Sequence, residues 1–232
     1  MTNEILFIAF TLFLLSLSLV AFKFGKTYIF ILIALFSILM NIFVLKQFNL
    51  FGLVVTGGNA LYGAMFLLTD ILSEHYGKRE AYLAVLIGFL SSAFFVVATQ
   101  VLLAFTVNEF DFAQPHLSAL FSLAPRILLG SMIAYIISQS FDVWSFNKIR
   151  KLTNSKYLWL RNNGSTLVSQ FIDTIIFTAI GLTAFTFLPF EGIIPTDLFW
   201  SVALATYIIK VIVAIIDTPF LYLTYKIKKQ NN

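Results

Sequence analysis

The sequence predicts an all-α, polytopic integral membrane protein, folded as a bundle of about six or seven transmembrane helices. Hydrophobic residues make up 59% of the 232 residues and charged residues only 11%, whereas soluble domains carry about 25% charged residues. The mean hydropathy is +0.92. The chain also divides into apolar runs of about 20 residues, the length that crosses the hydrocarbon core of a bilayer. We therefore expect a single transmembrane domain over residues 1–232.

Seven apolar runs, joined by short linkers, are the predicted spans. They cover residues 4–22, 27–45, 51–76, 81–106, 121–146, 164–188 and 198–225. The first run has no basic residue before it, and no small-residue cleavage site follows Phe22. These two features favour an uncleaved span over a signal peptide.

The distribution of Lys and Arg predicts the orientation, because cytoplasmic loops are enriched in basic residues. If Met1 lies outside, the inner segments hold most of the 15 basic residues, while the outer loops are acidic. The inner segments are then 23–26, 77–80, 147–163 and 226–232, and the acidic outer residues are Glu109, Asp111, Glu191 and Asp197. The net charge of +4 therefore reflects topology, and we expect no nucleic-acid partner.

The third span is rich in glycine, and Thr56-Gly57-Gly58-Asn59 is a poor sequence for the middle of a helix. Two interpretations are open. The helix is broken at Gly57-Gly58 and its freed backbone groups line a cavity, as in many transporters. Alternatively, the glycines let neighbouring helices approach closely.

Two carboxylates follow on one face of the same span, Asp70 and Glu74, four residues apart. Glu74 is near the inner end, where it is either solvated beside Lys78 or functional. Asp70 lies about two helical turns from Lys78, deeper in the predicted membrane, so it is less easily explained as a solvated group.

The fifth span places Arg126 about one turn inside the outer boundary. Its side chain either reaches outward to the interface or faces the bundle and binds an anion or a carbonyl group. The span ends in Ser138, Gln139 and Asp142, a pattern that recurs in the sixth span. Asp142 is close to the inner loop, so it is either solvated, paired with Lys148, or part of a site.

The sixth span repeats that pattern as Ser169, Gln170 and Asp173, after a basic loop and a predicted helix start at Gly164-Ser165. Gln170 and Asp173 share one helix face. A carboxylate at this depth costs roughly 2.5–3.5 kcal/mol on insertion scales, so it normally faces a partner or a water-filled cavity.

The seventh span carries Lys210 near its middle, with Tyr207 three residues earlier. A lysine there rarely faces lipid, so we expect it to pair with Asp173 or to serve a transport pathway. Asp217-Thr218-Pro219 is predicted to break or kink the inner half of this helix.

An enzymatic function is not expected. The two histidines, His75 and His116, fall on opposite sides of the predicted membrane, the chain has no cysteine, and no HExxH or GxSxG motif is present. We therefore expect no metal and no cofactor. There is no Walker motif either, so this chain does not hydrolyse ATP by itself.

Several ordered segments within residues 41–225 resemble the bacterial queuosine precursor transporters of the vitamin uptake transporter family. The segments are YGAMFLLTDILSEHYGKRE, PRILLGSMIAYIISQSFDVWSFNKIRK, YLWLRNNGSTLVSQFIDTIIF and YIIKVIVAIIDTPFLYL. Residues 1–25 lie outside this resemblance and look like an extra N-terminal span.

The resemblance implies a multi-pass transporter of the bacterial cytoplasmic (inner) membrane, and the distribution of Lys and Arg predicts its N-terminus outside and its C-terminus in the cytoplasm. It would import 7-deazaguanine derivatives, such as 7-cyano- and 7-aminomethyl-7-deazaguanine, for salvage into the tRNA modification queuosine. The alternative is the substrate-binding membrane component of an ATP-driven vitamin or nucleobase uptake complex. A homo-oligomer remains open. The family positions that the resemblance carries over are Asp70, Arg126, Asp142, Ser165, Thr166, Asp173 and Lys210.

The chemistry of a deazaguanine suggests how such positions would act. A carboxylate such as Asp70 or Asp173 accepts hydrogen bonds from the ring N–H and the exocyclic amine together. Arg126 or Lys210 would reach only the carbonyl oxygen, because carbon replaces the ring nitrogen that guanine offers beside it. An aromatic ring provides a stacking surface. The candidate binding residues are therefore Asp70, Arg126, Gln170, Asp173, Tyr207 and Lys210, with Asn59, Glu74, Asp142, Ser165 and Thr166 as secondary candidates and Tyr62 as a second stacking candidate.

Overall fold

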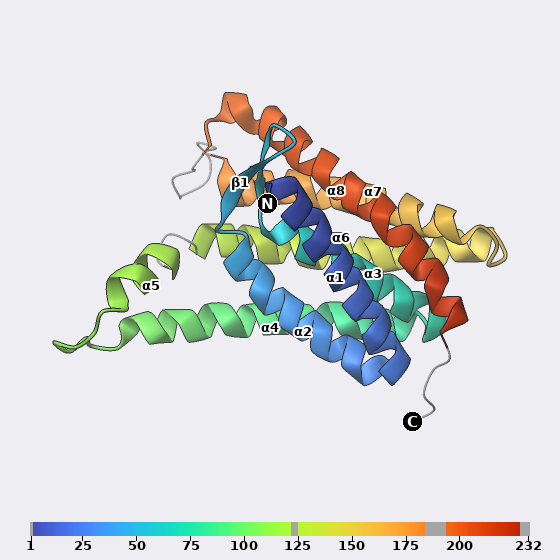
Figure 1. Cartoon of the computed structure of the whole chain (residues 1–232), viewed down its shortest axis with the longest axis horizontal. Helices are drawn as coiled ribbons and strands as arrows, with labels where there is room; N and C mark the ends of the chain where they lie inside the picture. Colours follow the sequence, from blue (N-terminus) through green and yellow to red (C-terminus); the bar gives the residue numbers. More distant parts are fainter. Residues whose placement is uncertain (1, 122–124, 184–193, 228–232) are drawn as a thin grey trace.

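Eight α-helices and one β-hairpin form the described part of the chain, which is residues 2–121, 125–183 and 194–227 of a computed structural model, without the side chains of residues 125–128 (Figure 1). The predicted all-α membrane fold is confirmed. The elements are α1 (Asn3–Phe24), α2 (Lys26–Phe43), β1 (Gln47–Leu50), β2 (Leu53–Thr56), α3 (Gly58–His75), α4 (Lys78–Ala104), α5 (Gln114–Phe121), α6 (Pro125–Leu152), α7 (Leu158–Phe177), the π-helical turn η1 (Thr178–Leu182), the 3-10 turn η2 (Thr196–Leu198), α8 (Phe199–Leu223) and the 3-10 turn η3 (Thr224–Lys226).

Helix α3 lies at the centre of the bundle. Every residue from Gly58 to Glu74 is buried, and the helix packs against α1, α2, α4, α6 and α8. A Cβ atom at Gly63 would lie 2.2 Å from Cγ1 of Val213 on α8, so only glycine permits this approach between the two helices. Of the two interpretations of the glycines, close approach applies at Gly63, and the helix begins at Gly58 rather than being broken there.

The prediction that the third span starts at residue 51 is wrong, because residues 47–56 form an antiparallel hairpin. Phe51 and Gly52 both have positive φ angles, 52° and 79°, as a two-residue turn with the twist of its strands requires. The hairpin covers the N-terminal end of α1 (Figure 1): Asn3 donates to the carbonyl oxygen of Asn49 at 3.0 Å, and Glu4 accepts from the backbone N–H of Phe51 at 3.2 Å.

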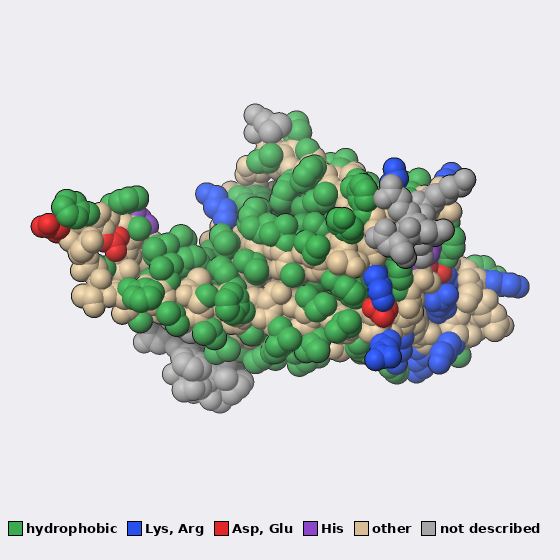
Figure 2. Space-filling model, turned by 90° about the horizontal axis from the view of Figure 1, so that it is seen from below, with side chains coloured by type: hydrophobic (Ala, Val, Ile, Leu, Met, Phe, Trp, Pro, Cys, Tyr) green, Lys and Arg blue, Asp and Glu red, His purple; other side chains and the backbone are tan. Residues whose placement is uncertain are grey.

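The outer surface of the bundle is apolar, as lipid contact requires. Large side chains such as Phe94 (71% exposed) and Trp200 (59% exposed) point outward, and apolar side chains cover the middle of the face in Figure 2. Five helical segments among the described residues are long and apolar enough to cross a membrane. Helix α3 is not among them because it carries Asp70, Glu74 and His75 in its inner half, all turned away from the lipid face by its central position.

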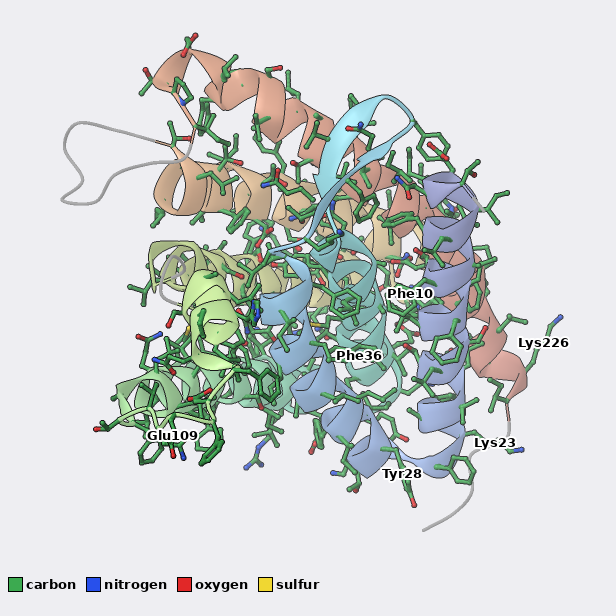
Figure 3. All side chains as sticks on the ribbon, turned by 60° about the vertical axis from the view of Figure 1, so that its left-hand side comes forward. Phe10, Lys23, Tyr28, Phe36, Glu109 and Lys226 are labelled. Carbon is green, nitrogen blue, oxygen red and sulfur yellow. The ribbon has the colours of Figure 1, made fainter. Side chains whose placement is uncertain are left out.

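The two ends of the bundle differ in charge. Lys and Arg side chains gather mostly at the end opposite the α4–α5 connection in Figure 2. In Figure 3, Lys23 and Lys226 point outward at this end, Glu109 lies at the other end, and Phe10 and Phe36 point into the bundle. This asymmetry follows the pattern from which the orientation was predicted.

The predicted start of the sixth span is wrong, and so is the predicted break in the seventh span. Helix α7 begins at Leu158 rather than at Gly164-Ser165, so Arg161 lies in its first turn and not in a loop. Helix α8 continues through Pro219 to Leu223, so Asp217-Thr218-Pro219 does not break it.

Candidate functional site

The predicted pair between Asp173 and Lys210 is present. Lys210 Nζ on α8 donates to Oδ2 of Asp173 on α7, and each side chain is 6% exposed. Oδ1 of Asp173 accepts from the hydroxyl of Tyr62 on α3 and, at 3.2 Å, from the hydroxyl of Ser138 on α6. The ammonium group of Lys210 also lies 4.5 Å from the ring centroid of Tyr62, a favourable cation–π distance. Four helices therefore converge on one carboxylate.

This pair forms the floor of a cavity of about 560 Å³, a size that suits a small organic ligand. The hairpin, α5, and the ends of α6, α7 and α8 nearest to it form the walls, which are largely apolar. The polar lining includes Gln47, Thr56, Asn59, Tyr62, Ser131, Asp173, Thr206 and Lys210. Among the described lining residues, Asp173 and Lys210 are the charged ones.

Asn59 and Gln170 carry polar groups that the protein leaves unused. The amide nitrogen of Asn59, which lines the cavity, has no hydrogen-bond partner among the described residues. Neither amide atom of Gln170 has one, although Gln170 is 1% exposed. Gln170 is not part of the cavity lining; it lies one turn before Asp173 on α7.

Tyr207 is not among the described residues that line this cavity, and the prediction for Arg126 lies outside the described side chains. Tyr207 donates to the carbonyl oxygen of Leu167 at 3.1 Å and packs edge-on against Phe171, so it contacts α7. The sequence predicts Tyr62 only as a stacking surface. The hydrogen bonds from the hydroxyl groups of Tyr62 and Ser138 to Asp173 were not predicted.

A second group of carboxylates lies deeper in the bundle, toward the basic end. It consists of Asp70 on α3, Asp142 on α6 and Asp217 on α8, which interact electrostatically and are at most 1% exposed. Asp142 accepts from Ser169 at 2.9 Å and from Thr166 at 3.3 Å.

The other two carboxylates of this group differ in how well they are satisfied. Asp217 accepts from Asn162 at 2.9 Å. Neither oxygen of Asp70 meets a hydrogen-bond donor among the described residues. The interpretation of Asp142 as solvated or paired with Lys148 is wrong, since Lys148 instead lies 4.6 Å above the ring of Trp144.

The repeated Ser-Gln-Asp pattern of α6 and α7 pairs reciprocally. Ser138 of the first copy donates to Asp173 of the second, and Ser169 of the second donates to Asp142 of the first. Because α6 and α7 run in opposite directions, these two hydrogen bonds are related by a local pseudo-twofold axis between the helices. The sequence shows the repeat, but only the antiparallel packing reveals that each copy binds the other.

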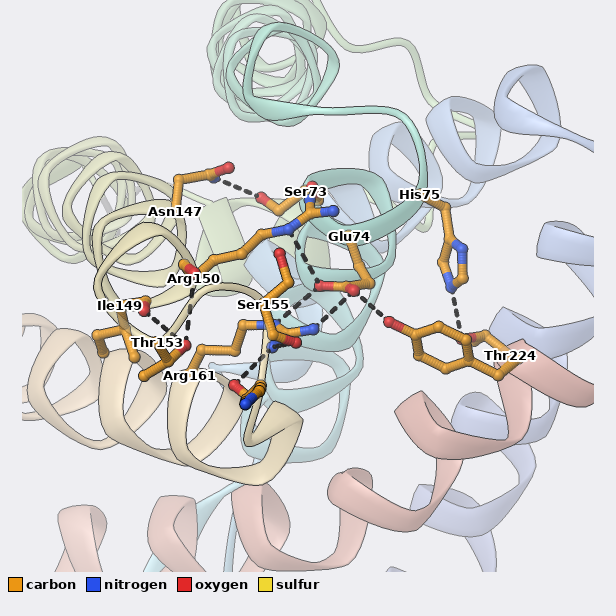
Figure 4. A network of polar contacts seen from close by, with 12 residues as sticks. Ser73, Glu74, His75, Asn147, Ile149, Arg150, Thr153, Ser155, Arg161 and Thr224 are labelled. Atoms are coloured by element: carbon orange, nitrogen blue, oxygen red, sulfur yellow. Dashed lines mark hydrogen bonds and ion pairs between the residues drawn. The ribbon is translucent and has the colours of Figure 1, made fainter.

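A polar network surrounds Glu74 at the basic end of the bundle (Figure 4). Arg161 holds Glu74 through two hydrogen bonds, of 2.9 and 2.7 Å, and caps the carbonyl oxygens of Ser155 and Lys156. Tyr225 also donates to Glu74. Both Glu74 (7% exposed) and Arg161 (1% exposed) are buried. The interpretation of Glu74 as a solvated group beside Lys78 is therefore wrong. This network joins α3, α7 and the segment after α8.

Ser165 and Thr166 lie between the two ends. Both are buried on α7, where Ser165 donates to the carbonyl oxygen of Asn162 at 3.3 Å and Thr166 contacts Asp142. They belong to the deeper carboxylate group and not to the cavity.

Comparison with known proteins gives consistent matches. The family described as "Putative vitamin uptake transporter" matches residues 56–224, which include α3 to α8. A protein of Bacillus subtilis (strain 168) named "Probable queuosine precursor transporter" is 39% identical over 228 residues, covering 97% of this chain and 96% of that protein. That alignment therefore extends into α1, which lies outside the family match.

A second relative carries the same name, "Probable queuosine precursor transporter", in Haemophilus influenzae (strain ATCC 51907 / DSM 11121 / KW20 / Rd). It is 26% identical over 151 residues, covering 62% of this chain and 59% of that protein. No solved structure matches the chain significantly.

Proposed function

Because the chain belongs to the vitamin uptake transporter family, we propose that it imports queuosine precursors, 7-deazaguanine derivatives, across the bacterial cytoplasmic membrane. The observation that carries this proposal is the buried Asp173–Lys210 pair on the floor of a cavity of about 560 Å³. In this role the protein is a carrier and not an enzyme, since it moves the base without changing it.

The pair complements the hydrogen-bonding edge of a deazaguanine. That edge presents a carbonyl oxygen, a ring N–H and an exocyclic amine in a row, which is one acceptor beside two donors. Lys210 is a donor and Asp173 an acceptor, and they lie next to each other. The base enters between them, so that Lys210 turns to the carbonyl oxygen and Asp173 accepts from the two N–H groups.

Two further groups support binding of a flat base. The ring of Tyr62 lies on the cavity floor and offers a stacking surface. The amide nitrogen of Asn59 is an unused donor at the same wall. Buried polar groups of this kind favour ligands that satisfy them, because an unpaired buried donor costs about 1–3 kcal/mol.

The position of the cavity next to the Asp173–Lys210 pair supports a direction of transport. The cavity is lined by the hairpin and by α5, at the end that we assign to the outside. The Glu74–Arg161 network joins α3 and α7 at the end that we assign to the cytoplasm, where Arg161 and Tyr225 line a second hollow. We therefore assign this structure to the outward-facing state. Release into the cytoplasm requires the Glu74 network to open, as in alternating access.

The experiment that tests this function is uptake of a labelled 7-deazaguanine precursor by cells that cannot make it, with this chain as the only added component. Accumulation of label, and restoration of queuosine in tRNA, are the expected results. Failure to accumulate label unless an ATPase subunit is added as well would favour the alternative, an ATP-driven complex in which this chain only binds the substrate.

A further inference from the structure

The polar interior of the bundle is arranged in two levels that use the same four helices. In the level that contains the cavity floor, Asp173 is surrounded by Tyr62 of α3, Ser138 of α6 and Lys210 of α8. In the deeper level, Asp142 is surrounded by Ser169 of α7, Asp70 of α3 and Asp217 of α8. The residues on α3 and α8 differ by about two helical turns between the levels, roughly 10–12 Å.

The two levels differ in charge. The first contains one carboxylate and one ammonium group, and it is neutral. The second level contains three carboxyl groups. Helix α8 contributes Asp217 to this level, whereas it contributes Lys210 to the first. The nearest cation on α7, Arg161, is engaged by Glu74, which lies one turn beyond Asp70 on α3. No Lys or Arg among the described residues forms an ion pair with Asp70, Asp142 or Asp217.

Asp70 is the group in this level that the protein leaves unsatisfied. Its side chain is 1% exposed, lies close enough to Asp142 for the two carboxyl groups to interact, and finds no donor for either oxygen among the described residues. Oδ2 of Asp142 and Oδ2 of Asp217 are also without donors there. Two neighbouring buried carboxyl groups repel each other when both are ionised, and a proton bound by one of them removes that repulsion and allows an O–H···O⁻ hydrogen bond between them.

We propose that the Asp70–Asp142 pair, with Asp217 beside it, is a proton-binding site that couples precursor uptake to proton entry. This inference rests on the proposed function. A proton enters with the precursor from outside, binds as a carboxylate becomes a carboxylic acid, and leaves to the cytoplasm when the Glu74 network opens. The proton gradient is the energy source, and the precursor itself is chemically unchanged.

The groups around these carboxyl groups favour a proton over a metal ion. No three His, Cys, Asp or Glu side chains among the described residues are arranged to hold a metal ion. Ser169 and Asn162 donate to one oxygen each of Asp142 and Asp217, and the remaining oxygens of these carboxyl groups and both oxygens of Asp70 are free to bind a proton. A proton requires only the carboxyl oxygens.

The test uses purified protein in liposomes that enclose a pH-sensitive dye, with 7-cyano-7-deazaguanine added outside. For the wild-type protein we expect addition of the precursor to acidify the interior. One proton driven by about 100 mV supports roughly 50-fold accumulation of a neutral precursor, and a protonophore should abolish that accumulation. No variant is needed for this measurement, so misfolding cannot obscure it.

The variants Asp70→Asn and Asp142→Asn locate the site. Neither residue is among those that line the cavity, so each variant should still bind the precursor but lose precursor-driven acidification and accumulation. Asp197→Asn, at an exposed position, should behave as wild type. Accumulation that follows a Na⁺ gradient, or acidification that persists in both variants, would overturn the proposal. Failure of the wild-type protein to bind or exchange the precursor at all would instead refute the proposed function.

Discussion

Lys210 of α8 donates a hydrogen bond to Asp173 of α7, and the two side chains are each 6% exposed in the middle of a membrane-spanning bundle. An ion pair removed from water in this way is stable only while both charges are present. The pair can serve structure, transport, or both, and variants of each residue separate these roles.

The first prediction concerns charge removal at this pair. Lys210→Met and Asp173→Leu should each destabilise the protein by roughly 3–5 kcal/mol, because one buried charge is left without a partner. The double variant should regain most of the stability but not the uptake, since the substrate loses both of its anchors. Thermal unfolding in detergent and uptake of labelled precursor are measured side by side.

The exposed pair between Lys26 and Glu80 supplies the matched control. Its side chains are 48% and 24% exposed, at 3.2 Å, so Lys26→Met should cost less than about 1 kcal/mol. Full recovery of uptake in the double variant of Lys210 and Asp173 would mean that neither charge touches the substrate.

The second prediction concerns the hydroxyl group of Tyr62. Tyr62→Phe keeps the ring beside Lys210 but removes the hydrogen bond to Asp173. A hydrogen bond to a charged group is worth about 1.5–3 kcal/mol, so precursor affinity should fall by roughly 10- to 100-fold through poor positioning of the carboxylate. Tyr82→Phe is the control, because that hydroxyl binds the carbonyl oxygen of Ser140 away from the cavity. Equal affinities of the two variants would remove Tyr62 from the site.

The third prediction concerns the basic end of the bundle. Arg161→Gln should release Glu74 and let α3 and α7 separate there. The chain has no cysteine, so a single Ser165→Cys change gives a clean probe at a position that is now fully buried. A thiol reagent applied to the cytoplasmic side should label this cysteine slowly alone and much faster together with Arg161→Gln.

Arg79→Gln, at an exposed arginine of the same end, should leave that labelling slow. Labelling that is equally slow in the Arg161 variant would show that the Glu74 network does not close the pathway.

The fourth prediction concerns topology. With most basic residues in the loops at one end, Met1 should lie outside and Asn232 in the cytoplasm. A reporter enzyme that is active only outside the cell should therefore be silent when fused after Asn232. Activity of that fusion would reverse the orientation, and with it the assignment of the cavity to the outer side.

The helical framework and the central ion pair could be predicted from the sequence because both follow from strong energetic rules. Apolar runs of membrane length in an all-α protein are helical, and two opposite charges at similar depth in neighbouring spans are expected to pair. The hairpin was missed because its apolar residues Leu53 to Val55 continue the hydrophobic run of the third span. The β-branched pair Val54-Val55 after the turn residue Gly52 was the available signal.

The deeper carboxylate group could not be predicted because it depends on helix rotation and pairing. Asp142 stands near an inner loop rich in Lys and Arg, so the sequence left open whether it is solvated, paired with Lys148, or part of a site. In the structure it turns inward to Ser169. Sequence spacing places Asp142 on a face of α6 but does not say which helix that face meets. The hydrogen bond between Glu74 and Arg161 was not predicted for the same reason, since the two residues are 87 positions apart in the sequence.

The affinity of the purified protein for labelled 7-cyano-7-deazaguanine, compared between wild type and Asp173→Asn, tests the central claim most directly. The asparagine side chain keeps the shape of the carboxylate but presents only one acceptor to the two N–H groups of the base. We predict binding by the wild-type protein and a loss of at least about 10-fold for the variant, the equivalent of one charge-assisted hydrogen bond. Equal affinities, with thermal unfolding showing that both proteins are folded, would contradict the assignment of Asp173 as the residue that holds the substrate.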